Sequence, residues 1–330
     1  MAQLTRTATA RRRRSRPPVR FVNRPPRSGG GRLARLRRYR VPLLMLVPGL
    51  LFYCLYYYLP IFGNVIAFQD YLPFVGIRHS AFNGLDNFRI LFESSEFWYS
   101  LVNTLEITAL QLIFFFPAPI ILALLLNSLL SNRLRRIIQS IIYIPHFMSW
   151  VVVVILFQQI FGGAGLIPQA LRTHGVSNPI DVMTNPAFFK PLVTAQVIWK
   201  DTGWGTIIFF AAITSIDVAL YESAAMDGAN GFQRMWHVTL PGIIPITILL
   251  LILRIGTILS VGFEQILLQE PAVGAKAGQV LDTYVYFHGI VDGNWSVGAA
   301  AGLVKGAVGL ALVMLSNWIA HRLGEAGLYS

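Results

Sequence analysis

Long apolar segments alternate with shorter polar ones along most of the chain. The first runs from Val41 to Phe68 without a charged side chain, and a helix that crosses a bilayer needs only about 20 residues. Similar segments predict further spans at about 100–130, 137–161, 191–216, 243–266 and 297–320. The pattern therefore predicts an all-α integral membrane protein with six transmembrane helices.

Prolines and polar clusters divide these segments. Pro117 and Pro119 predict a kink in the second span, and Pro145 lies with His146 inside the third. The segments 69–98, 162–190 and 268–296 are polar and rich in turn residues, so we expect loops there, with a possible short helix around Leu281–Gly289.

Positive charge is concentrated at the amino terminus. Of the 27 Lys and Arg residues, 14 lie in the first 40 positions, and all 14 are arginine. With its Pro, Gly and Ser content, residues 1–40 are predicted to be a disordered tail preceding a six-helix domain at 41–330. The run Arg11–Arg14 is also compatible with nucleic-acid binding or targeting, but an anchor beside anionic lipid is the simpler interpretation.

The distribution of basic residues along the chain predicts its orientation in the membrane. Six spans place both termini on one side, and the segments on that side hold 19 of the 27 basic residues. The positive-inside rule therefore predicts cytoplasmic termini. Charged residues make up only 13% of the chain and mean hydropathy is +0.57, as expected for a protein in the cell membrane.

Enzyme signatures are absent from the sequence. It contains no G-x-x-x-x-G-K-[ST] phosphate loop, no H-E-x-x-H zinc motif and no G-x-S-x-G elbow. Cys54 is the single cysteine, and the six histidines show no metal-ligand spacing. We therefore expect no catalytic residue, no metal and no cofactor in this chain, so energy for uphill transport would come from another subunit.

A polar insert at 217–242 separates the fourth and fifth predicted spans. Glu222–Met226 can form a short helix, and Gly228 and Gly231 permit a reversal. Pro241 and Pro245 suit the first turns of the next span. Such an element can dock on a partner as a helix in a groove. The alternative is an ordinary amphipathic helix beside the membrane.

Within this insert, E-S-A-A-M-D-G-A…V-T-L-P resembles the EAA loop of binding-protein-dependent ABC permeases, whose pattern is E-A-A-x-x-x-G followed by I-x-L-P. Ser223 replaces the first alanine of that pattern and Val238 its isoleucine, both mild departures. The resemblance implies that residues of this loop couple the chain to an ATPase: Glu222, Ser223, Ala224, Asp227, Gly228, Leu240 and Pro241.

Other stretches resemble the carbohydrate-uptake (MalF-type) branch, and most of all its LplB-like group of oligosaccharide and polysaccharide-fragment permeases. They are A-F-Q-D-Y at 67–71, G-L-D-N-F at 84–88, N-T-L at 103–105, I-P-H-F-M-S-W at 144–150, D-T-Y-V-Y at 282–286 and G-L-V-K at 302–305. The resemblance covers residues 41–330 and excludes the arginine-rich tail.

This resemblance implies a type I ABC importer permease fold and a set of partners. These are a second permease subunit, two cytoplasmic ATPases that bind ATP and Mg, an extracytoplasmic solute-binding protein and a carbohydrate substrate. Nucleic acid is not among them. A permease for a peptide or a glycerol-phosphate ester, or a channel without an ATPase partner, is the alternative.

Ionisable residues inside predicted spans are costly and are therefore candidates for function. Three acids and three bases fall there, and they could pair with one another or contact a polar substrate: Glu106, Asp201, Glu264, Lys200, Arg254 and Lys305. Aromatic faces often bind sugars, although they also pack at membrane interfaces. The candidate substrate path is Trp199, Asp201, Trp204, Arg254, Glu264, Tyr284 and Tyr286, while His146 either packs or lines the path.

Overall fold

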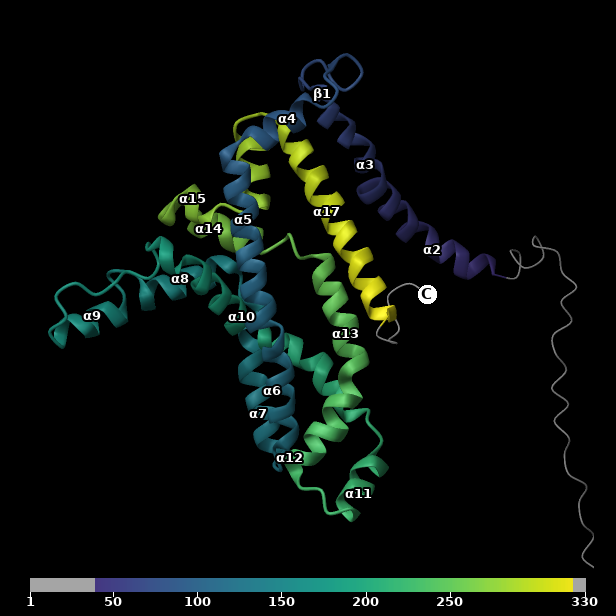
Figure 1. The fold of residues 1–330 in the computed structure, drawn as a ribbon, viewed down its shortest axis with the longest axis vertical. Coiled ribbons are helices and arrows are strands. Elements are labelled where there is room, and N and C mark those ends of the chain that lie inside the picture. Colours follow the sequence, from purple (N-terminus) through teal and green to yellow (C-terminus); the bar gives the residue numbers. More distant parts are fainter. Residues whose placement is uncertain (1–38, 323–330) are drawn as a thin grey trace, which may run out of the picture. The chain divides into compact units, whose positions relative to one another are not determined.

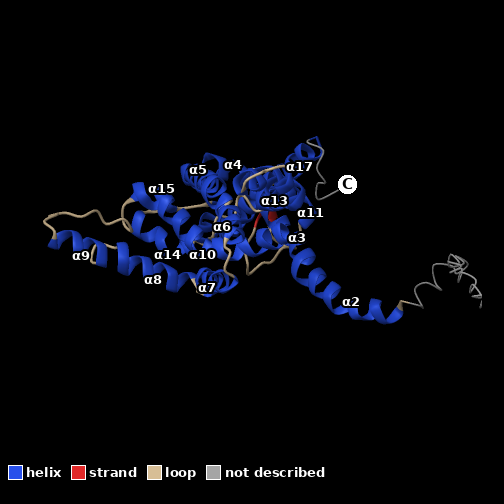
Figure 2. Cartoon of the chain, turned by 90° about the horizontal axis from the view of Figure 1, so that it is seen from below, coloured by secondary structure: helices blue, strands red, loops and turns tan. Residues whose placement is uncertain are grey.

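The structure is a computed structural model that describes residues 39–322. Contacts divide the chain into two units, Met1–Pro60 and Ile61–Ser330. The predicted tail at 1–40 lies almost wholly outside the described residues. Figure 2 shows that helices make up nearly all of the regular structure.

The described part of the first unit is one apolar helix. It comprises α2 (Arg40–Tyr53) and a π-helical segment, η1 (Cys54–Tyr58), and α3 (Leu59–Gly63) crosses the division between the units. Aromatic rings follow one another along it, with centroids 5.0 Å apart for Phe52–Tyr56 and 5.2 Å for Tyr53–Tyr57. Together with the residues up to Phe68, it forms a candidate span of 29 residues.

The second unit begins with a 3-10 turn, η2 (Asn64–Phe68), and a small antiparallel hairpin in which Gln69 lies opposite Phe82. Its strands and helices are β1 (Gln69–Asp70), β2 (Ala81–Phe82), α4 (Asp86–Glu93), α5 (Ser95–Leu110), α6 (Pro117–Ser128), α7 (Asn132–Tyr143), α8 (Trp150–Phe161), α9 (Leu166–Thr173), α10 (Pro186–Thr214), α11 (Val218–Met226), α12 (Gly231–Arg234), α13 (Leu240–Gly256), α14 (Phe263–Val273), α15 (Ala275–Gly278), α16 (Leu281–Tyr284) and α17 (Trp295–Arg322).

Among the described residues, five helices are long and apolar enough to cross a membrane. A sixth arises if α10 and α11, which meet at a bend of 66°, count as one broken span. The chain is thus a multi-pass helical membrane protein. The second span joins α5 and α6 through a π-helical turn, η3 (Gln111–Phe115), directly before Pro117. Since proline crowds the preceding helical turn, the wider π turn accommodates it.

Two helices, α10 and α17, make most of the packing contacts in the second unit. α10 packs on α6 and η3, and α17 packs on α13, α4, η2 and a π-helical segment, η6 (Val285–Val291). Figure 1 shows α11 and α12 at one end of this unit, and α4 with the β1–β2 hairpin at the opposite end. The close approach of α10 to α7 depends on Gly203, where a Cβ would lie 2.0 Å from the carbonyl oxygen of Ile142.

The predicted third span, 137–161, is wrong as a continuous helix. α7 ends at Tyr143, a 3-10 turn, η4 (Ile144–Phe147), follows, and Met148 has an extended backbone. A new helix starts where the Ser149 side chain caps the Val152 amide at 3.4 Å. The candidate span is Trp150–Thr173 instead, and α9 lies in what we predicted to be a loop.

The predicted fifth span, 243–266, is also wrong in its bounds. This span begins at Gly231 and ends at Gly256, where Thr257 leaves the helical conformation and its amide bonds to the Arg254 carbonyl at 3.1 Å. Glu264 therefore lies in the first turn of α14, outside the candidate spans. Hydropathy continues across this break, which is why the sequence pattern did not mark it.

Candidate functional site

The predicted coupling helix forms as α11 and is capped at both ends. Asp217 precedes it, and its side chain accepts a hydrogen bond from the Ala219 amide at 2.9 Å. At the other end the Ala229 amide donates to the Ala224 carbonyl at 2.9 Å and the Gly228 amide to the Ala225 carbonyl at 3.1 Å. This Schellman arrangement needs a positive φ, which Gly228 supplies at 82°. The predicted reversal at Gly228 is confirmed.

The chain then re-enters the bundle through a second cap. Asn230 accepts from the Gln233 amide at 2.9 Å, and the Gln233 side chain accepts from the Asn230 amide at 2.7 Å. Gly231 is thus the first residue of α12 and makes no left-handed turn. α12 continues through a π-helical turn, η5 (Met235–Thr239), into α13, so the next span is joined to the loop without a flexible break.

One side-chain contact ties α11 to this re-entry segment. The Tyr221 hydroxyl lies 3.0 Å from the Thr239 hydroxyl, and Thr239 is buried. This contact joins α11 to the last residue before α13.

The predicted coupling residues fall into two groups. Glu222, Ser223 and Asp227 are exposed on α11 and its carboxyl end. Leu240 and Pro241 instead begin α13, at its junction with η5. Apolar side chains are also exposed beside the acidic ones, with Met226 89% and Phe232 68% exposed. The loop thus presents a mixed apolar and acidic surface suited to a protein partner.

Inside the bundle, one charged cluster surrounds His146. Its Nδ1 lies 2.8 Å from the Asp201 carboxylate, and its ring stacks on Trp204 at 4.4 Å and 7°. Lys200 donates to the His146 carbonyl at 2.6 Å and lies over the Trp150 ring. The 3-10 turn at Pro145, which breaks the predicted third span, is what brings His146 to α10.

A second interior cation belongs to α13. The Arg254 guanidinium donates to Gln111 Oε1 in the π turn between α5 and α6, and it lies 5.6 Å from the Phe115 ring centroid. Among the described residues, Lys200 and Arg254 bond only to neutral oxygens. Asp201 is the acid that acts electrostatically on Arg254, without a direct ion pair among the described residues.

No ion pair joins two of the six ionisable residues; five of them contact groups outside that set, and Asp201 acts on Arg254 only electrostatically. Glu106 pairs with Lys190 from the start of α10, and Lys305 with Asp282 of α16. Asp201 pairs with His146, and Arg254 with Gln111. Polar residues flanking the spans thus supply the partners. Lys190 and Asp282 stand in segments that hydropathy assigns to loops, so the sequence pattern gave no reason to connect them.

Four predicted path residues lie apart from this cluster. Tyr284 is only 2% exposed and packs on Phe97 at 5.9 Å, so its ring belongs to the core. Tyr286 packs on Phe263 of α14. Trp199 packs on Phe157 and lines an apolar cavity of about 410 Å³. Glu264 lies in α14. The structure therefore brings together only Asp201, Trp204 and their partners near His146.

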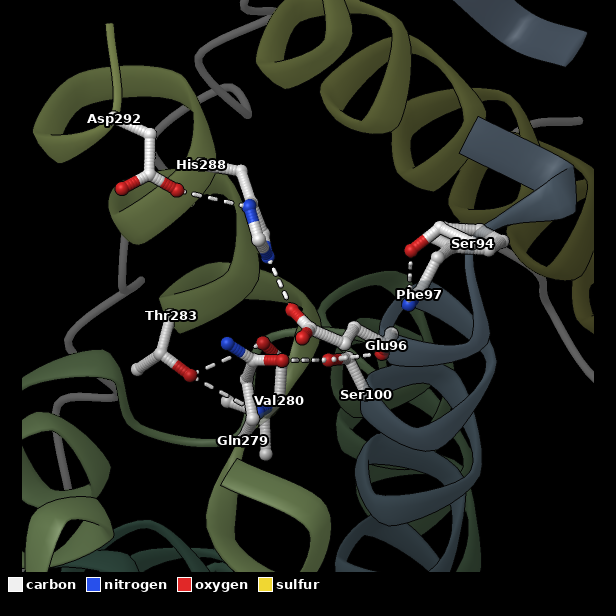
Figure 3. Close-up of polar contacts among 9 residues, drawn as sticks. All are labelled: Ser94, Glu96, Phe97, Ser100, Gln279, Val280, Thr283, His288 and Asp292. Atoms are coloured by element: carbon white, nitrogen blue, oxygen red, sulfur yellow. Dashed lines mark hydrogen bonds and ion pairs between the residues drawn. The ribbon is translucent and has the colours of Figure 1, made fainter. Parts of the chain in front are cut away.

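A further polar cluster joins α5 to the segment before α17. Figure 3 shows His288 between the carboxylates of Glu96 and Asp292, at 2.7 Å and 3.0 Å. Nearby, Ser100 donates to the Gln279 side chain at 2.9 Å. This cluster fixes the end of the unit opposite α11.

Buried polar groups also connect α10 to α14. Gln265 donates to Gln196 at 2.7 Å, and Gln196 exchanges hydrogen bonds with Gln269 at 2.9 Å and 3.0 Å. All three side chains are buried. Next to them, burial raises the pKa of the Glu270 carboxyl, and a hydrogen bond from Thr283 partly opposes this. The sequence analysis named none of these residues, because glutamines carry no charge to flag them inside an apolar segment.

Comparisons with known proteins agree on one family. The chain is 46% identical to the polygalacturonan/rhamnogalacturonan transport system permease protein YteP of Bacillus subtilis, over 90% of this chain and 92% of that one. It is 43% identical to Protein LplB of the same organism, over 90% and 93%. A solved bacterial alginate ABC transporter, in complex with an alginate pentasaccharide-bound periplasmic protein, superposes with a TM-score of 0.81 at 34% identity, over 89% of this chain and 98% of that chain.

The match to a family extends over most of the bundle. Residues 116–325 match the family described as the binding-protein-dependent transport system inner membrane component. These residues include the charged cluster on α10, the whole coupling loop and α17. The chain therefore belongs to the family of binding-protein-dependent transport system inner membrane components.

Proposed function

We propose that this chain is the permease subunit of an ATP-driven importer of carbohydrate, in which separate ATPase subunits bind ATP and Mg. The observation that carries this proposal is the coupling loop. α11 is an exposed helix with caps at both ends, and short turns connect it to α10 on one side and to the helical segment that leads into α13 on the other. A displacement of this helix by a cytoplasmic ATPase would move the transmembrane helices that are connected to it.

The proposed topology has six spans with both termini in the cytoplasm. α10 supplies the sixth span, which the sequence pattern placed at 191–216, and α11 is then a separate cytoplasmic helix after the 66° bend. The distribution of basic residues supports this orientation. A second permease subunit, two ATPases and an extracytoplasmic binding protein complete the proposed importer.

We propose that the cargo is an oligosaccharide that carries carboxylates. The relatives named for polygalacturonan, rhamnogalacturonan and alginate support an acidic sugar. Lys200 and Arg254 support it independently, since each donates a hydrogen bond only to a neutral oxygen among the described residues. Asp201, the acid that acts electrostatically on Arg254, is already hydrogen-bonded to His146. Cations inside a membrane are costly, and a substrate carboxylate would offset part of that cost.

Reconstitution of the complete importer tests this function. Uptake of labelled acidic oligosaccharides should require ATP and the binding protein. Glu222→Lys should reduce ATP-driven uptake by roughly tenfold or more without changing the unfolding temperature, because Glu222 is exposed on α11.

Arg133→Glu is the matched control. It reverses one exposed charge in the first turn of α7, outside the loop, and should transport normally. Uptake at the wild-type rate by the Glu222→Lys importer would contradict the coupling role. Equal uptake of neutral and acidic oligosaccharides would contradict only the cargo.

A further inference from the structure

The 217–242 loop forms a pocket that lies behind the exposed surface of α11. The pocket measures about 260 Å³ and lies between the carboxyl end of α11 and the re-entry segment. Its lining combines small residues with two basic side chains and one acid: Ala224, Asp227, Gly228, Ala229, Gln233, Arg234, His237 and Val238. It is smaller than the pockets of about 300 Å³ and above that hold drug-sized ligands.

The guanidinium of Arg234 is the unusual group in this pocket. Its Nε is buried and has no hydrogen-bond partner, and no described residue bonds to the rest of the guanidinium. Arginine remains charged at all relevant pH values, and its Nε and Nη form a fork that matches a carboxylate. A desolvated donor without an acceptor is uncommon, and it indicates a partner outside the chain.

We infer that the pocket receives an acidic side chain of the ATPase subunit, which pairs with Arg234 behind the coupling helix. This inference rests on the proposed function, because it takes the partner at α11 to be the ATPase. It adds to the proposed contact of Glu222 with the ATPase a second contact, in which this chain supplies the opposite charge. Exposed Glu222 presents a negative charge to the partner, whereas Arg234 presents a positive charge inside a concave site.

Location favours a protein carboxylate over a lipid headgroup. Three of the lining residues, Ala224, Asp227 and Gly228, belong to α11 and its cap, the element we propose to dock on the ATPase. Charge does not separate the two, because a carboxylate and a phosphodiester each carry one negative charge and Asp227 repels both. An acidic side chain seated there would hold α11 and the start of α13 together, since the pocket spans both.

The test uses the complete importer in nanodiscs of neutral phosphatidylcholine. ATP hydrolysis stimulated by sugar-loaded binding protein and the retention of the ATPase subunits are measured for Arg234→Gln and Arg234→Lys. We expect Arg234→Gln to lower both by about tenfold or more, and Arg234→Lys to retain part of each. Wild-type retention should fall with rising salt more steeply than that of Arg234→Gln.

Arg136→Gln is the matched control. It also removes one cytoplasmic guanidinium, and the native Arg136 side chain bonds only to the Asn132 carbonyl. A scan of the acidic residues on the permease-facing surface of the ATPase should then find one whose replacement by lysine restores activity to Arg234→Glu. Wild-type stimulation in Arg234→Gln, or no restoring acid in the scan, would overturn the inference. An effect of Arg234→Gln that appears only with anionic lipid would assign the pocket to a headgroup and also overturn it.

The two proposals can fail separately. If Glu222→Lys uncouples the importer while Arg234→Gln behaves as wild type, the coupling function stands and the pocket contact is wrong. If Glu222→Lys transports normally, the proposed function itself is wrong.

Discussion

Gly203 provides the sharpest test of how α7 and α10 are held together. In Gly203→Ala, the added Cβ would lie 2.0 Å from the Ile142 carbonyl oxygen and 2.7 Å from its carbon, against the 3.4–4 Å of ordinary contact. Both obstructing atoms are backbone, so no side-chain rotation relieves the clash. The two helices must separate by more than an ångström at this point.

The cost of such overpacking is typically about 1–3 kcal/mol, and the backbone clash places this variant at the upper end. We therefore expect the unfolding temperature of the detergent-solubilised chain to fall by roughly 4–5 °C, because the entropy of unfolding grows with chain length. Gly306→Ala is the control, because nothing lies within 4 Å of its Cβ, and alanine favours a helix over glycine by about 1 kcal/mol. Sugar uptake should fall in Gly203→Ala as well, since separation also displaces His146 from Asp201. An unfolding temperature within a degree of wild type would refute the close contact.

Three further variants test separate contacts. Tyr221→Phe removes the hydroxyl that contacts Thr239, and we expect a loss of about 1 kcal/mol in stability together with more ATP hydrolysed per sugar transported, measured in proteoliposomes. Lys305→Asp should abolish sugar uptake and lower stability by about 1–3 kcal/mol. If the pair is structural, the double variant Lys305→Asp with Asp282→Lys should restore uptake. No rescue would argue for a direct role of Lys305 in transport. Burial raises the pKa of the Glu270 carboxyl, so its ionisation opposes folding, and the free energy of unfolding falls as pH rises through that pKa. Glu270→Gln should therefore raise the unfolding temperature at pH 8. This gain should shrink toward pH 4.5, the ordinary pKa of a glutamate side chain.

The coupling loop was predictable because its structure is local. A helix of nine residues, a glycine in the left-handed region and a proline near the start of the next helix are each set by a few neighbouring residues. The sequence therefore specified the helix and the turn at Gly228 correctly. Gly231 was misread because its neighbour Asn230 forms a cap with Gln233, which makes the glycine a helical residue.

The errors in the spans have a different origin. Hydropathy measures which residues tolerate lipid, and it does not record where the helical hydrogen bonds stop. The apolar residues of 137–161 and 243–266 continue through breaks at Met148 and Thr257. Tertiary contacts stabilise the first break, since the turn before it places His146 against Asp201 and Trp204. The pairing of charges failed for the same reason, because it depends on which helices are neighbours.

The continuity of α10 connects the two parts of the candidate site. This helix carries Lys200, Asp201 and Trp204 within one rigid run of 29 residues, and it ends at Thr214, three residues before the Asp217 cap of α11. On its other side, α11 contacts Thr239 at the start of α13, the helix that carries Arg254. A displacement of α11 therefore acts on both helices that hold the interior cations. Because Lys200 and Arg254 sit on different helices, any change in the angle between α10 and α13 alters the spacing of their charges. If the cargo is the acidic sugar that we propose, its affinity should therefore depend on the position of α11.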